Sequence, residues 1–133
     1  MKTAQVLATV EVPGEAGSVT IARAYIRGIL LAAGRPTVDH IELLIGELLT
    51  NSVQHSDSGR RPDGVVRLRV FDDGRTVHVD VTDQGSSASV PRIPPSTDLL
   101  SESGRGLRLV QELSSAWGWR ADHSGRTVWF EVT

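Results

Sequence analysis

The stretch Glu47-Leu48-Leu49-Thr50-Asn51-Ser52-Val53-Gln54-His55 decides how the rest of the chain is interpreted. Around it apolar or small residues recur at spacings of three and four, the period of an amphipathic helix: Ile41, Leu44, Ile45, Leu48, Leu49 and Ser52. On that helix Glu47, Asn51 and His55 follow one another at steps of about 6 Å and about 40°, so they form a polar row beside the apolar stripe. A carboxylate, an amide and an imidazole in a row can hold a divalent cation and activate a hydroxyl or water. The alternative is an ordinary solvated helix face.

Composition limits the classes of protein to which the chain can belong. It has 133 residues, no cysteine and a formal net charge of -2. The length suits one domain, residues 1–133, with a two-layer core. The charge argues against direct nucleic-acid binding, and the lack of cysteine excludes disulfides and thiolate sites. With no signal peptide recognised and no apolar run long enough to cross a bilayer, a cytoplasmic protein without membrane contact is expected.

The first half of the chain is expected to form one strand and two helices. Alternation of apolar and polar residues predicts the strand, and three- and four-residue spacing predicts the helices. Glycine and proline mark their ends. In order, these are a strand over 3–12 with Val6, Ala8 and Val10 on one face, a helix over 15–33 stopped by Gly34, and the helix of the polar row, capped by Thr37 or Asp39.

The second half is expected to form two hairpins around a long loop and a short helix. An Asp-Gly pair between alternating segments is a strong hairpin signal, and a loop without any period is usually a lid or disordered. Helices in runs and strands in antiparallel pairs favour an α+β two-layer sandwich, with helices on one face of a mixed, mostly antiparallel sheet. In order, the elements are strands over 66–71 and 76–82, a lid over 86–103, a helix over 107–113, and strands over 116–122 and 126–132 that turn at Ser124-Gly125.

Three short motifs each allow a functional and an ordinary interpretation. Asp83-Gln84-Gly85 follows a strand, where a carboxylate could accept from the exocyclic amine of a ligand; Asp-x-Gly is also a common turn. Gly104-Arg105-Gly106-Leu107 opens a helix, where free amides favour anions, but an ordinary loop-to-helix entry looks the same. In Gly125-Arg126-Thr127, Thr127 could bind a purine or a water beside Asp83, or could simply favour a strand.

The order of these motifs along the chain resembles that of the GHKL, or histidine kinase-like, ATPase family. The sequence has Glu-x-x-x-Asn on a helix, Asp-x-Gly after a strand, a long lid, Gly-x-Gly-Leu opening a helix and Gly-x-Thr in a closing hairpin. The small size and the Glu47-Leu48-x-x-Asn51-x-x-x-His55 pattern look most like the anti-sigma-factor serine kinase branch. The resemblance covers nearly the whole chain and implies a Bergerat-type sandwich.

The resemblance implies a role for each motif residue. Asn51 would coordinate Mg²⁺ on the ATP phosphates and Glu47 would be the general base, while His55 matches a histidine common in this branch. Asp83 would bind the adenine amine, with Gly85 close to the ring and Thr127 in the adjoining water network. The remaining implied nucleotide-binding residues form the glycine box, whose amides would face the phosphates: Gly104, Arg105, Gly106 and Leu107.

The resemblance also implies partners, and two departures from the family pattern bear on activity. The implied function is an ATP-dependent serine/threonine kinase that phosphorylates an anti-anti-sigma (STAS) protein, holds a sigma factor and forms a homodimer. The second glycine expected after Asp83-x-Gly85 is Ser87 here. Where some relatives carry an arginine before the glycine box, this chain has Glu102, which leaves Arg105 as the nearest cation. The alternative is a nucleotide-binding regulatory switch without phosphotransfer.

Overall fold

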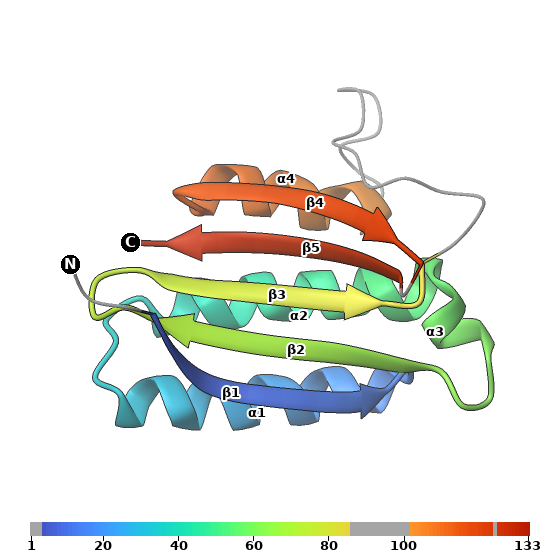
Figure 1. Cartoon of the computed structure of the whole chain (residues 1–133), viewed down its shortest axis with the longest axis horizontal. Coiled ribbons are helices and arrows are strands. Elements are labelled where there is room, and N and C mark those ends of the chain that lie inside the picture. The colour runs from blue at the N-terminus through green and yellow to red at the C-terminus, as the bar shows by residue number, and fades with distance from the viewer. Residues whose placement is uncertain (1–3, 86–101, 124) are drawn as a thin grey trace.

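The computed structural model describes residues 4–85, 102–123 and 125–133, with the side chains of 102–106 excepted. Most of the expected lid, including Ser87, and the turn residue Ser124 lie outside the described residues. The elements, in chain order, are β1 (Gln5–Pro13), α1 (Ala16–Ala32), α2 (Val38–His55), α3 (Asp57–Arg60), β2 (Val65–Asp72), β3 (Val77–Asp83), α4 (Glu102–Leu113), β4 (Ala116–Asp122) and β5 (Gly125–Val132) (Figure 1).

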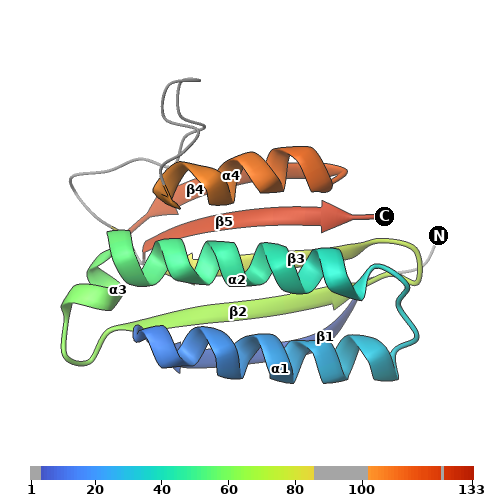
Figure 2. The same cartoon turned by 180° about the vertical axis from the view of Figure 1, so that it is seen from behind.

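The strands form one sheet, and α1, α2 and α4 lie side by side on one of its faces (Figures 1 and 2). The strand order is β1-β2-β3-β5-β4. Each neighbouring pair of described strands is antiparallel. Strands β3 and β4 run in the same direction, but β5 lies between them, so they do not pair with each other. The expected α+β two-layer sandwich is confirmed, and the parallel pairing that a mixed sheet allows does not occur between the described strands.

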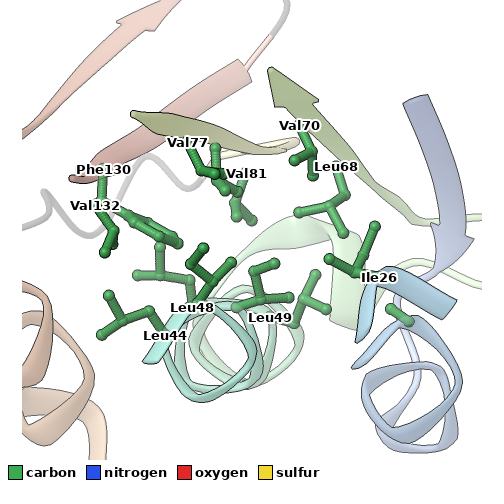
Figure 3. Packing of buried hydrophobic residues seen from close by; sticks show 14 of the residues in the cluster. Ile26, Leu44, Leu48, Leu49, Leu68, Val70, Val77, Val81, Phe130 and Val132 are labelled. Carbon is green, nitrogen blue, oxygen red and sulfur yellow. The ribbon is translucent and has the colours of Figure 1, made fainter. Parts of the chain in front are cut away.

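The hydrophobic core lies between the helix layer and the sheet, as the apolar periods predict. α2 runs along the middle of the layer and buries Leu44, Leu48 and Leu49 against the sheet (Figure 3). Alternate residues of the central strands meet them from the sheet side: Val66, Leu68, Val70, Val77, Val79, Val81, Phe130 and Val132. Within the described residues, no helix is both long and apolar enough to span a membrane.

Strand β1 differs from the alternation expected of it. Its pairing with β2 shifts register between Val6 and Ala8, so Val6 pairs with Phe71 while Ala8 pairs with Val70. The extra residue of this β-bulge turns Val6 to the face opposite Ala8. Ala8 is 7% exposed and Val6 is 55% exposed. The prediction that Val6 and Ala8 lie on the same face of the strand is therefore wrong.

The predicted helix stop at Gly34 is confirmed, whereas the predicted cap of α2 is only partly so. Gly34 has φ 73°, its backbone N–H donates to the Leu31 carbonyl at 3.0 Å, and that of Arg35 donates to the Leu30 carbonyl at 3.1 Å, as in a Schellman motif. Thr37 is the N-cap residue, but its side chain makes no capping hydrogen bond. Asp39 lies in the first turn and accepts from Arg27 at 2.8 Å instead.

The hairpin turn between β2 and β3 follows the predicted Asp-Gly signal. Gly74 has φ 91°, which a side chain would strain. The Asp73 carboxylate accepts from the backbone N–H of Thr76 at 2.7 Å and of Arg75 at 2.9 Å. These hydrogen bonds, Thr76 first, lower the pKa of Asp73 below its ordinary value. The turn therefore holds the two strands in register.

The Gly125→Ala variant is expected to lose at least about 2 kcal/mol of unfolding free energy. Gly125 has φ 140°, and an added Cβ would lie 2.0 Å from the Asp83 carbonyl oxygen. Gly28→Ala in α1 is the matched control, since a Cβ there meets nothing within 4 Å among the residues that the structure describes. That change is expected to stabilise the protein by about 0.5–1 kcal/mol. Urea unfolding curves compare them, and equal stability of the two variants would contradict the close approach of β5 to Asp83.

Candidate functional site

The polar row of α2 is a partly buried flank and not a solvated face. Glu47, Asn51 and His55 are each intermediate in exposure. On the other flank Glu42 accepts from Arg27 of α1 at 2.7 Å, and a Cβ added to Gly46 would lie 2.9 Å from the Arg23 side chain. Residues five positions further along a helix are turned by about 140° from these two. Glu47 and Asn51 are those residues, so the row is turned away from α1. Helix α4 is the neighbour of α2 on that other side (Figure 2).

Asp83 is a buried carboxylate at the end of β3, 4% exposed. Its Oδ1 accepts from the backbone N–H of Gly85 at 2.7 Å, and its Oδ2 accepts from the Ser52 hydroxyl, also at 2.7 Å. Arg126 of β5 contacts the same Oδ2 through its Nη2 at 3.4 Å. Burying a charged group is costly unless it is paired and hydrogen-bonded, so these three donors explain how the carboxylate is accommodated.

The Ser52–Asp83 hydrogen bond joins the α2 row to the end of β3. Ser52 is the residue next to Asn51 in α2, so this bond brings the row and the buried carboxylate to the same end of the molecule. The periodicity placed Ser52 in the apolar stripe and missed its role. A buried hydroxyl nearly always has a hydrogen-bond partner, so a serine in an apolar stripe is itself a sign of a polar contact.

The segment after β3 is fixed against the chain that follows α2. The Gln84 backbone N–H donates to the Ser58 hydroxyl at 2.8 Å, and the Gly85 carbonyl accepts from the Asp57 backbone N–H at 2.8 Å. Gly85 has φ 70°, and a Cβ added there would be in ordinary van der Waals contact, at 3.9 Å, with Gly125 and Arg126 of β5. The glycine is therefore needed for its backbone conformation.

Thr127 does not lie beside Asp83, which corrects its predicted place. In the β3–β5 pairing Thr127 is opposite Thr82, and their hydroxyls are 2.8 Å apart. Successive side chains of a strand point to opposite faces, so both threonines lie on the face of the sheet away from Asp83 and α2. The residue opposite Asp83 is Arg126, which the motif interpretation passed over.

The glycine box also differs from its predicted placement. Helix α4 begins at Glu102 and not at Leu107, so the two box glycines lie inside the helix and not ahead of it. Gly104 belongs to the first turn, whose N–H groups have no partner within a helix, but Gly106 lies beyond it. Leu107 is 6% exposed and belongs to the hydrophobic core. The Arg105 side chain lies outside the described part of the structure.

A sandwich that brings a buried carboxylate and a polar helix row to one end has the layout of a ligand-binding domain. Residues 12–132 match the family model described as histidine kinase-like ATPase domain. The chain belongs to the histidine kinase-like ATPase domain family. The recognition of the GHKL family from the motif order is thus confirmed.

Three individual matches carry the name of a blue-light-activated histidine kinase. Blue-light-activated histidine kinase 2 of Erythrobacter litoralis (strain HTCC2594) is 37% identical over 83 residues, which are 62% of this chain and 22% of that protein. The structure of the E. litoralis EL346 blue-light activated histidine kinase matches with a TM-score of 0.56 and 25% identity over 92% of this chain and 42% of that chain. The histidine kinase domain from EL346 matches at 0.54 and 25%, over 91% of this chain and 61% of that one.

The chain spans less than two thirds of the length of each of these relatives. Their names describe histidine kinases, and the anti-sigma branch therefore stays a prediction. The structural matches agree with the α+β architecture described above.

Proposed function

We propose that the chain binds Mg-ATP at the end of the molecule where α2 meets β3. Asp83 accepts the adenine amine, with Gly85 beside the ring. Asn51 holds the Mg²⁺ ion, which would neutralise charge on the phosphates when bound. Gly104 and Arg105, in the first turn of α4, lie on the phosphate side. The single observation that carries the proposal is the 2.7 Å hydrogen bond from Ser52 to Asp83, because it ties the metal-binding row to the adenine acceptor.

The residues present fit a nucleotide in two further respects. Within the described residues the Nε2 atom of His55 is buried and has no hydrogen-bond partner. A buried polar atom without a partner costs about 1–3 kcal/mol, and a nucleotide bound along the row would supply one. Mg²⁺ in such sites is held mainly by phosphates and waters, with one or two protein ligands. A single amide from Asn51 is therefore a reasonable protein contribution.

For the chemistry, we propose an ATP-dependent protein serine/threonine kinase of the anti-sigma type, acting in the cytoplasm. Glu47 lies one helical turn before Asn51 and takes the proton from the attacking hydroxyl of the acceptor protein. In phosphoryl transfer the protein mainly positions groups and neutralises charge, so few residues suffice. The proposed acceptor is a serine or threonine of a STAS protein, and the proposed further partner is a sigma factor.

The test is incubation of the protein with Mg-ATP labelled on the γ-phosphate and a candidate STAS protein. Transfer to serine or threonine gives an acid-stable phosphoprotein, whereas transfer to histidine gives an acid-labile one. Acid-stable label on the STAS protein is the expected result. Label that acid removes would reassign the acceptor to histidine, in line with the names of the relatives, and would overturn the serine/threonine proposal.

The second candidate is a nucleotide-binding switch without phosphotransfer. It is favoured by the contact between Arg126 and Asp83, which occupies the proposed adenine acceptor, and by Ser87 and Glu102 in place of the family pattern. Calorimetry that detects ATP binding, together with no label on any acceptor protein, would favour this candidate over the kinase.

A homodimer is proposed for the chain, with the outer face of α1 as its contact. Ile21, Tyr25 and Leu31 of α1 are 69%, 50% and 57% exposed, while the arginines of this helix, Arg23 and Arg27, turn toward Glu42 of α2. Contiguous exposed apolar surface commonly marks a protein–protein contact. Light scattering is expected to give twice the monomer mass for the wild type and the monomer mass for Ile21→Lys. Trp119→Lys, at a 40% exposed apolar residue of β4, is the control that keeps the dimer. A monomeric wild type at high concentration removes the proposal.

A further inference from the structure

Arg126 contacts Asp83, the proposed adenine acceptor, and the proposed function gives this arginine no role. It pairs directly with Asp83 across the β3–β5 register, so both side chains point to the same face of the sheet. The Arg126 side chain is 10% exposed and the Asp83 side chain is 4% exposed. The contact is therefore a buried ion pair in the interior of the sandwich and not a surface contact.

The Arg126 guanidinium occupies one of the acceptor positions of the Asp83 carboxylate, which the amine of a nucleobase would also use. Oδ2 of Asp83 already accepts from the Ser52 hydroxyl at 2.7 Å, and Nη2 of Arg126 lies 3.4 Å from the same atom. Oδ1 accepts from the Gly85 N–H at 2.7 Å. An ionised carboxylate has about four acceptor sites, so three protein donors leave about one for a ligand. The paired cation also reduces the negative charge that attracts an amine.

We propose that Arg126 sets the nucleotide affinity of the site by holding Asp83, and that the purine competes with its guanidinium for the carboxylate. The inference rests on the proposed function, because it concerns the same acceptor. It makes Arg126 a determinant of affinity for bases with a 6-amino group. Removing a cation normally weakens the binding of a polyphosphate through lost attraction. If Arg126 instead competes for Asp83, removing it strengthens ATP binding. The sign of the change in affinity therefore distinguishes this role from general attraction of the phosphates.

The Arg126→Thr variant tests this by calorimetry with ATP and with inosine triphosphate, at fixed Mg²⁺ and salt. Freed from the guanidinium, Asp83 is expected to bind ATP about tenfold more tightly than the wild type, the effect of one charged hydrogen bond. Inosine triphosphate carries an oxygen in place of the 6-amine, so its affinity should not rise. Arg120→Thr is the matched control: this arginine of β4 is 60% exposed, lies 3.9 Å from Asp80, and its loss should change neither affinity.

Arg126→Gln provides a second variant if loss of the buried ion pair prevents Arg126→Thr from folding, because the amide keeps much of the length without the charge. Unchanged or weaker ATP binding by a folded Arg126 variant would overturn the inference and leave the proposed ATP site standing. Equal gains for both nucleotides would also overturn it. Absence of ATP binding by the wild type and all variants would instead remove the proposed function, and the role of Arg126 with it.

Discussion

Replacing Glu47 by glutamine is expected to lower the rate of phosphoryl transfer by about 100- to 10,000-fold, the contribution of a general base. The amide keeps the size of the side chain but cannot take a proton from the acceptor hydroxyl. Because Glu47 is proposed to act on the acceptor and not on the nucleotide, ATP affinity should stay within about twofold of the wild type. Single-turnover transfer and calorimetry, done on the same preparation, separate the two effects.

Glu42→Gln is the matched control for Glu47. Glu42 lies on the same helix but on the flank that faces α1, where it pairs with Arg27 at 2.7 Å and with Arg23 at 3.5 Å. Its loss is expected to cost some stability without slowing transfer. Equal rates for Glu47→Gln and the wild type would remove Glu47 from the mechanism. Equal losses in both variants would assign the effect to the packing of α2.

The Asp83→Asn variant is expected to weaken ATP binding by about 10- to 100-fold, the range for a lost hydrogen bond to a charged group. Asparagine has nearly the same shape but only one acceptor oxygen, for which the Gly85 N–H and the adenine amine would compete. The change also leaves the buried Arg126 beside a neutral side chain, so the melting temperature should fall. Calorimetry and thermal unfolding measure the two consequences separately.

Asp80→Asn is the control for Asp83→Asn, since it alters a carboxylate of the same strand on the opposite face of the sheet. Asp80 is 7% exposed, and its Oδ1 lies 2.7 Å from Nε2 of His78. The variant should be less stable than the wild type and yet bind ATP with unchanged affinity. If Asp80→Asn weakens binding as much as Asp83→Asn does, the loss reflects general destabilisation and the adenine assignment fails.

Periodicity predicted the sandwich because burial acts on whole faces of helices and strands. Every central strand buries the alternate residues expected of it, and α2 buries its apolar stripe. The bulge in β1 could not be predicted in this way, since one extra residue leaves the local alternation intact and shows only in the pairing with β2. Val6 was misassigned for that reason.

The site was less predictable, because its contacts join residues far apart in the chain. The motif order found Asp83 and the row of α2, but it could not show which residue of β5 lies beside the carboxylate. A shift of one residue along a strand turns a side chain to the other face, which separates Thr127 from Arg126. Ser52 was missed for a related reason: a small side chain in an apolar stripe does not show which distant residue is its partner until the strand end is placed.

The start of α4 illustrates a third limit. Glycine is a weak helix former, so local propensity predicts that the box precedes the helix. The structure begins the helix at Glu102, and Leu107 faces the core. Helix packing overrides local propensity here.

The crystal structure of the protein with Mg²⁺ and a non-hydrolysable ATP analogue tests the central claim most directly. The expected complex has the adenine 6-amine within hydrogen-bond distance of the Asp83 carboxylate, the guanidinium of Arg126 moved off that carboxylate, and the metal ion on the Asn51 side-chain oxygen. A nucleotide bound elsewhere on the molecule, with the Asp83 and Asn51 side chains both untouched, would contradict the account.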